Sequence, residues 1–188
     1  MLCINALGAD TAAPKYTALK QDSGKNVSQM NLTLFTITSA FGLDGLQIGE
    51  AVKFTAPKAG WKLRGVQVVG WSGFNNTTQT FPSDKNFLLE IRDKDLNLLY
   101  KFADAQNNYF LSPTGAVSGT IEVPALPVTG DFYVVFYDRG SMAVLMEKDS
   151  GTGNSFLFGN GVLELAQQTN VTTNETQKIN WMIEALGQ

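Results

Sequence analysis

Residues 86–102 read NFLLEIRDKDLNLLYKF, in which two apolar runs are separated by the charged segment Asp93-Lys94-Asp95. Both runs alternate with a period of two, and the residues on the apolar side are Phe87, Leu89, Ile91, Leu98, Tyr100 and Phe102. Alternation of this kind is typical of a β-strand with one buried face. Because the two runs flank a short polar turn, the stretch predicts a β-hairpin.

Two further stretches indicate buried strands. Residues 131–137 read DFYVVFY and are apolar on both faces, so we expect this strand at the centre of a sheet that is covered on both sides. In residues 61–71, Leu63 is out of phase with Val66 and Val68. A one-residue slip around Gly65 restores the phase, which predicts a β-bulge there.

The rest of the chain adds strand-length segments and few helical windows. These segments are residues 16–20, 32–38, 50–55, 118–123, 142–146 and 179–185, the last of which ends the chain as a buried strand. Residues 167–177 are the most polar segment and are expected to be a flexible loop. About eight to ten closely spaced strands without an internal repeat predict an all-β fold, a two-sheet antiparallel β-sandwich. We assign residues 15–188 to this single domain and residues 1–14 to a flexible leader.

The composition excludes several classes of function. The 188 residues contain no histidine and carry a formal charge of -3. Without histidine a Ser-His-Asp or Cys-His catalytic site is impossible, and the negative charge argues against a nucleic-acid partner. The single cysteine, Cys3, cannot close an intrachain disulfide and has no partner for a metal site. No run of about 18 apolar residues is present, so no membrane span is expected.

Seven short segments of strand and turn carry a family resemblance. They are QDSG at 21–24, EAVKFTAP at 50–57, LRGV at 63–66, FLLEIRD at 87–93, TGDFYVV at 129–135, residues 150–158 and WMIEA at 181–185. In this order they resemble a jelly-roll, galactose-binding-like accessory domain of prokaryotic secreted and cell-surface proteins. The resemblance implies a jelly-roll-like, non-catalytic module that accompanies proteases, adhesins or glycan-active enzymes. It also implies an extracellular or cell-surface location, and some relatives bind carbohydrate or a structural calcium ion.

Two loops carry side chains of the kind that a sugar site needs. A sugar ring stacks its apolar face on an aromatic side chain, and its hydroxyl groups bond to amides and carboxylates. The residues that offer this chemistry are Trp71, Phe74, Asn75, Asn76, Asn107, Asn108 and Tyr109. We take Trp71, Phe74, Asn75 and Tyr109 as the candidate ligand site. The structural interpretation is that Trp71 ends a strand in the core and that Phe74 plugs its loop.

Acidic residues offer two further interpretations. Asp93, Asp95 and Asn97 alternate as oxygen ligands of calcium do, although a solvated hairpin turn fits the same residues. A glycoside hydrolase needs two facing carboxylates, and the carboxylates available are Glu90, Glu122, Asp131 and Glu147. Nothing in the sequence marks two of these four as neighbours. We therefore assign no catalytic residue, no metal ligand and no cofactor, with structural calcium left as an open alternative.

The sequence thus predicts a non-catalytic extracellular β-sandwich module with a structural or interaction role at the cell surface. Its expected partner is a glycan, as in adhesion, or a surface protein. The first alternative is a carbohydrate-binding, lectin-like module. The second is a carboxylate-based glycoside hydrolase.

Overall fold

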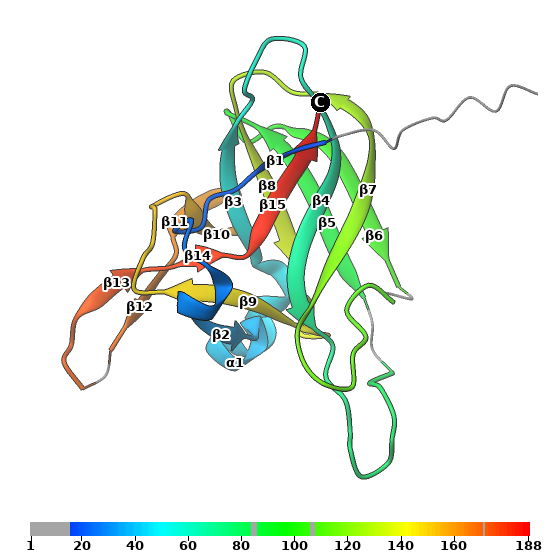
Figure 1. The fold of residues 1–188 in the computed structure, drawn as a ribbon, viewed down its shortest axis with the longest axis vertical. Helices are drawn as coiled ribbons and strands as arrows, with labels where there is room; N and C mark the ends of the chain where they lie inside the picture. The colour runs from blue at the N-terminus through cyan, green and yellow to red at the C-terminus, as the bar shows by residue number, and fades with distance from the viewer. Residues whose placement is uncertain (1–15, 84–85, 106–107, 171) are drawn as a thin grey trace, which may run out of the picture.

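The protein folds as an antiparallel β-sandwich in which two large sheets face each other (Figure 1). The computed structural model describes residues 16–83, 86–105, 108–170 and 172–188. Within this part of the chain the predicted two-sheet, all-β sandwich is confirmed. The flexible leader assigned to residues 1–14, with Cys3, lies outside the described residues, as does Asn107.

The seven-stranded sheet has the order β1-β15-β4-β9-β14, with β2 paired to β9 and β7 paired to β4. Its strands are β1 (Thr17–Leu19), β2 (Asn31–Phe35), β4 (Lys62–Trp71), β7 (Val117–Pro127), β9 (Ala143–Lys148), β14 (Asn180–Trp181) and β15 (Ile183–Gly187). The six-stranded sheet has the order β11-β10-β3-β8-β5-β6. Its strands are β3 (Gly49–Thr55), β5 (Phe87–Asp93), β6 (Leu98–Asp104), β8 (Asp131–Tyr137), β10 (Ser155–Gly159) and β11 (Val162–Leu165).

Two segments differ from the sequence-based expectation. The strand expected over residues 32–38 ends as β2 at Phe35, and the chain continues as helix α1 (Ile37–Phe41) and the 3₁₀ helix η2 (Gly42–Gln47), after an earlier 3₁₀ turn η1 (Val27–Gln29). The flexible loop expected at residues 167–177 is wrong, because β12 (Gln167–Thr169) and β13 (Thr176–Lys178) pair as a separate hairpin. Short strands of this kind bring the total in the described residues to fifteen, above the expected eight to ten.

The hairpin predicted over residues 86–102 is confirmed as β5 and β6. Leu89 pairs with Phe102 and Ile91 pairs with Tyr100, so the apolar residues of both strands share one face. Leu89 and Ile91 are fully buried, whereas Leu98 remains 48% exposed. Leu98 is exposed because β6 is the edge strand of its sheet and because a register shift after Ile91 pairs Leu98 with Arg92.

Strand β8 is the predicted central strand and is buried on both faces. It lies between β3 and β5. Its inward residues Phe132, Val134 and Phe136 belong to the main core between the sheets. Its outward residues Val135 and Tyr137 belong to a second, smaller cluster on the outer face of the same sheet. The two-sided burial inferred from the sequence is therefore correct.

The bulge predicted near Gly65 is also confirmed. Opposite β15, Leu186 pairs with Gly65 and the next residue, Gly187, pairs with Leu63, which leaves Arg64 as the extra residue in β4. A bulge resets the alternation of side chains. As a result Leu63 and Val66 are both fully buried in the core despite being out of phase in the sequence.

The lower end of the sandwich in Figure 1, where α1, β2 and the β4–β5 loop lie, contains two buried acids. Asp138, directly after β8, accepts hydrogen bonds from the backbone N–H groups of Ile37 (3.1 Å) and Gly140 (2.6 Å), and so holds the start of α1. Glu50 on β3 is fully buried, and neither carboxyl oxygen has a hydrogen-bond partner. Burial, reinforced by the charge of Asp138, raises the pKa of Glu50 well above its usual value. Burial also raises the pKa of Asp138 to about 6.

These raised pKa values predict that protein stability falls as the pH rises. The folded chain retains protons on Glu50 and Asp138 at pH values where the unfolded chain has lost them. The free energy of unfolding therefore falls as the pH rises above about 4. For Asp138 this loss continues to about pH 6. Glu50→Gln mimics the protonated acid, so the variant should match the parent near pH 4 and become increasingly more stable towards neutral pH.

Urea unfolding at several pH values measures this difference in the free energy of unfolding. The matched control is Glu164→Gln on the exposed side of β11, which should change stability by no more than about 0.5 kcal/mol. A Glu50→Gln effect that is independent of pH would contradict the prediction.

Candidate functional site

Trp71, at the end of β4, lines a hollow on the outside of the seven-stranded sheet. Its neighbour Gly70 faces the core, where an added Cβ would meet Met142 and Phe110, so the Trp71 side chain points the other way. The indole is half-buried, and its Nε1 donates a hydrogen bond to the Ser112 carbonyl oxygen at 2.8 Å. The hollow has a volume of about 450 Å³, and its lining includes Leu34, Thr36, Trp71, Pro82, Met142 and Ala143. Trp71 thus does not lie in the core.

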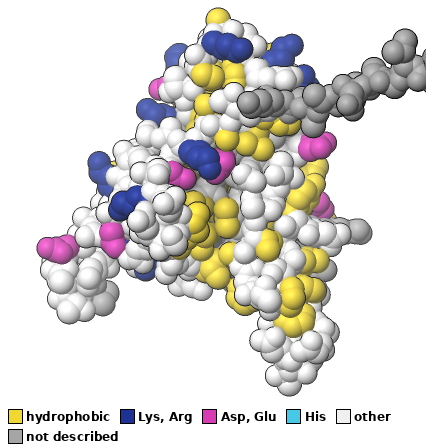
Figure 2. Space-filling model, in the orientation of Figure 1, with side chains coloured by type: hydrophobic (Ala, Val, Ile, Leu, Met, Phe, Trp, Pro, Cys, Tyr) yellow, Lys and Arg dark blue, Asp and Glu magenta, His cyan; other side chains and the backbone are white. Residues whose placement is uncertain are grey.

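Phe74 and Asn75 lie in the projecting loop between β4 and β5. The Phe74 ring packs on Phe81, with 4.9 Å between the ring centroids. The Asn75 Oδ1 atom accepts hydrogen bonds from the backbone N–H groups of Thr77 (2.9 Å) and Thr78 (3.1 Å), which holds the turn of the loop. Figure 2 shows hydrophobic side chains gathered on this loop, which forms the lowest part of the view. Phe74, Asn75 and Pro82 line a second hollow, next to that of Trp71.

Tyr109 lies in the other predicted loop, which contacts the first through the backbone. The N–H group of Ser72 donates to the Phe110 carbonyl oxygen at 3.1 Å, so the two loops meet as expected. Tyr109 is 37% exposed, and its ring meets Phe87 edge-on at 5.9 Å. It is absent from the lining of both hollows. The structure therefore brings Trp71, Phe74 and Asn75 to adjacent hollows and leaves Tyr109 outside them.

The candidate calcium ligands of the β5–β6 turn are engaged with one another. Asp93 Oδ1 accepts hydrogen bonds from the backbone N–H groups of Asp95 and Asn97, both at 2.9 Å. Asp93 Oδ2 accepts from the Asn97 side chain at 3.0 Å, and this bond is the main reason that the pKa of Asp93 is lowered. This is the pattern of an Asx turn that closes a hairpin.

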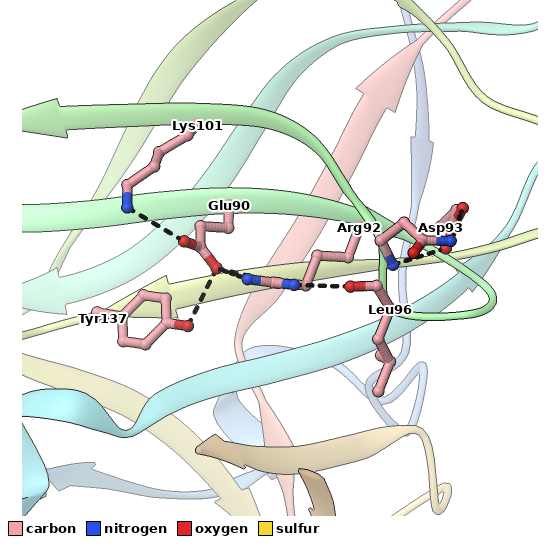
Figure 3. A network of polar contacts seen from close by, with 7 residues as sticks. Glu90, Arg92, Asp93, Leu96, Lys101 and Tyr137 are labelled. Atoms are coloured by element: carbon pink, nitrogen blue, oxygen red, sulfur yellow. Dashed lines mark hydrogen bonds and ion pairs between the residues drawn. The ribbon is translucent and has the colours of Figure 1, made fainter. Parts of the chain in front are cut away.

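The most strongly connected charges lie on the outer face of the six-stranded sheet (Figure 3). Glu90 Oε2 accepts hydrogen bonds from Arg92 Nε (3.0 Å), Arg92 Nη2 (2.7 Å) and the Tyr137 hydroxyl (3.1 Å). Glu90 Oε1 forms an ion pair with Lys101 at 3.5 Å. Burial and the nearby Glu90 charge raise the pKa of Tyr137, so its hydroxyl stays a hydrogen-bond donor at neutral pH.

Arg92 also covers part of this outer face, because its side chain reaches Phe158 across two strands that carry smaller residues. Its guanidinium carbon lies 4.7 Å from the centroid of the Phe158 ring on β10, although β3 and β8 separate their strands. The intervening residues Ala51 and Val135 are small, and both are fully buried. A cation over an aromatic ring contributes about 1 kcal/mol, and the Arg92 stem also covers apolar surface. The sheet is therefore covered on this side by its own side chains.

A third polar cluster fastens the N-terminal segment to the seven-stranded sheet. Glu147, fully buried on β9, accepts hydrogen bonds from the backbone N–H of Ser23 (3.0 Å), from the Ser23 hydroxyl and from the Asn180 amide (2.8 Å). Asn180 Oδ1 in turn accepts from the Thr152 backbone N–H at 2.8 Å. This carboxylate therefore serves to join three segments of the chain.

A polar hollow lies beside the β12–β13 hairpin, where the sequence predicted a flexible loop. Its volume is about 410 Å³, and its lining includes Asn31, Asp149, Gln168, Asn170, Glu175 and Gln177. The abundance of Asn, Gln and Thr in residues 167–177 was the one sequence feature that could have indicated this polar hollow. The sequence did not predict the hollow, because these polar side chains come together only when β12 pairs with β13.

Two general observations apply to the described ranges of the chain. No group of three or more His, Cys, Asp or Glu residues there is arranged to hold a metal ion. Among the described residues, no helix is long and apolar enough to cross a membrane.

Comparison with solved structures identifies a similar fold. The clostridial cysteine protease Cwp84, after propeptide cleavage, matches 94% of this chain with a TM-score of 0.51 and 11% sequence identity. A structure of the cysteine protease and lectin-like domains of Cwp84, a surface layer associated protein of Clostridium difficile, matches 75% of this chain with a TM-score of 0.44 and 13% identity. The matches span 41% and 32% of those chains. At 11% identity the first similarity concerns the fold alone.

The sequence itself gives no assignment to a family. No family model matches the chain, and no curated protein matches it.

The Glu90 network predicts unequal effects of two charge-removing substitutions. Glu90→Gln leaves Arg92, whose side chain is only 19% exposed, without its carboxylate partner, which should lower the free energy of unfolding by about 3 kcal/mol. Lys101→Gln removes a side chain that is 54% exposed and should cost less than about 1 kcal/mol. Urea unfolding of both variants makes the comparison, and equal small losses would show that the network does not support the fold.

Proposed function

We propose that the chain is a non-catalytic β-sandwich module of an extracellular or cell-surface protein, with a structural or interaction role. The observation that carries this proposal is that its well-connected buried charges bind neighbours within the fold. Glu90 binds Arg92 and Tyr137, Glu147 binds Ser23 and Asn180, and Asp138 caps α1. Groups held in this way stabilise strands and are not free to act on a substrate.

The fold similarity supports the surface context. Cwp84 is described as a surface layer associated protein, and its structure includes a cysteine protease and a lectin-like domain. This chain consists mainly of β-strands and has no histidine to activate a cysteine nucleophile. It therefore resembles an accessory domain of such a protein more than a cysteine protease domain. A jelly-roll-like, galactose-binding-like relationship fits the same picture and is part of the proposal.

The carboxylates considered for a glycoside hydrolase do not favour that alternative. Glu90 lies on the six-stranded sheet and Glu147 lies on the seven-stranded sheet. Asp131 accepts a hydrogen bond from the Thr55 hydroxyl at 2.6 Å, and Glu122 points outward on β7. Because none of the four lines a hollow described above, no pair of them faces a common substrate position.

A second candidate function, carbohydrate binding, is favoured by the surroundings of Trp71. An outward-facing, half-buried indole beside Pro82 and the Phe74–Phe81 pair offers apolar faces on which a pyranose ring can stack. The amide and hydroxyl groups of the projecting loop offer partners for sugar hydroxyls. The expected partner in this case is a glycan, and in the first case a surface protein.

Binding to a panel of immobilised glycans, with and without calcium, tests both candidates. If Trp71 stacks on a sugar, Trp71→Ala should reduce binding about tenfold, since an aromatic contact contributes roughly 0.5–1.5 kcal/mol beyond the area that it buries. The matched control is Tyr16→Ala, which removes a 43% exposed aromatic ring beside β1 and should leave binding unchanged. Because Trp71→Ala also removes the bond to Ser112, its fold is checked by circular dichroism.

Three outcomes separate the alternatives. Loss of binding in Trp71→Ala alone supports the carbohydrate-binding role. No binding to any glycan leaves the structural or protein-interaction role. Release of reducing sugar from a bound glycan would overturn the non-catalytic proposal.

A further inference from the structure

The polar hollow beside β12–β13 is assembled from three separate parts of the chain. Asn31 begins β2, Asp149 follows β9, and Gln168 and Gln177 come from the β12–β13 hairpin. Its volume of about 410 Å³ falls in the range of about 300–1,000 Å³ that is typical of small-molecule sites. A concave surface of this size, built by segments more than a hundred residues apart, is a feature of the fold and not of one loop.

The register of the hairpin shows which of its side chains share a face. Gln168 pairs directly with Gln177, so both side chains lie on the same face of the hairpin. The preceding residue, Gln167, lies on the opposite face and is not part of the lining of the polar hollow, although both Gln167 and Gln168 line a second, apolar hollow with Trp181. Two neighbouring amide side chains of the hairpin therefore line the polar hollow, together with Asn31 and Asp149.

The lining favours a neutral ligand that carries many hydroxyl groups. Each amide of Gln168 and Gln177 supplies both donors and an acceptor, which is what vicinal hydroxyl groups require. The Asn31 amide donates one hydrogen bond to Asp149 and keeps its second N–H and its oxygen for a ligand. Asp149 and Glu175 add acceptors and Lys148 adds a donor, so the charged residues of the lining sum to one negative charge. This balance disfavours phosphate or another anion. Buried Ile179 supplies an apolar contact for a sugar C–H face.

We propose that this hollow is a saccharide-binding site, separate from Trp71, that takes one or two sugar rings through hydrogen bonds to Gln168 and Gln177. This proposal rests on the proposed non-catalytic role of the chain, but it does not require that the Trp71 hollow binds a sugar. It contains no aromatic platform, so its affinity for a single sugar should be weak. A millimolar Kd corresponds to only about −4 kcal/mol of binding free energy.

The two hollows have separate reporters in a ¹H–¹⁵N NMR spectrum. The side-chain amides of Gln168 and Gln177 report on the polar hollow, and the Trp71 indole N–H reports on the other. The probes are the methyl glycosides of glucose, galactose and mannose, N-acetylglucosamine and cellobiose, each added to about 10 mM so that weak binding is detected. The expected result is a saturable shift of the Gln168 and Gln177 amide signals with at least one probe.

Substitutions assign the shifts to the hollow. Gln177→Ala should abolish the shift of the Gln168 amide or weaken the Kd at least fivefold. Gln167→Ala is the matched control, because it makes the same change on the opposite face of the same hairpin and should leave the Kd unchanged. If Gln177→Ala loses the backbone signals of β12–β13, Gln177→Asn shortens the side chain by one methylene, keeps the amide and tests the same contact.

The remaining outcomes overturn the proposal. Shifts confined to the Trp71 indole would place saccharide binding at the other hollow, and shifts absent with every probe would exclude this site. Equal weakening by Gln167→Ala and Gln177→Ala would also exclude it. Release of methanol from a methyl glycoside, followed in one-dimensional ¹H spectra of the same samples, would overturn the non-catalytic role instead, so the two failures are distinguished.

Discussion

The burial of β8 on both of its faces is the constraint on which the rest of the structure depends. One face, with Phe132, Val134 and Phe136, must be covered by the second sheet, and this requires a sandwich. The other face, with Val135 and Tyr137, would otherwise expose apolar surface to water. Each large side chain removed from water contributes about 2 kcal/mol, so both faces need a cover.

The outer face is covered without a further layer of secondary structure. Arg92 extends across Val135 and Ala51 to Phe158, and Glu90 fixes its guanidinium by two hydrogen bonds. Glu90 and Arg92 therefore serve as a cover for the sheet. The accessible hollows described here lie instead beside Trp71 and beside β12–β13, the hairpin that projects to the left in Figure 1. Recognition is accordingly proposed for those two places.

Sequence alternation predicted the strands whose burial follows a local period. It identified the β5–β6 hairpin, central β8 and the bulge at Arg64–Gly65, because these features depend on neighbouring residues. It missed α1, since the N–H of Ile37 is held by Asp138, which lies 101 positions away. It missed the polar hollow for the same reason, because Gln168 and Asn31 come together only after folding. Local patterns carry no information on such contacts.

Amide hydrogen exchange, followed residue by residue, tests the central role of β8 most directly. If both faces of β8 are sealed, its amides should exchange only through global unfolding, with the same opening free energy as those of β3 and β5. The amides of the exposed β12–β13 hairpin should exchange much faster, through local opening. Exchange of β8 as fast as that of β12–β13 would contradict the account, because the outer face could not then be closed.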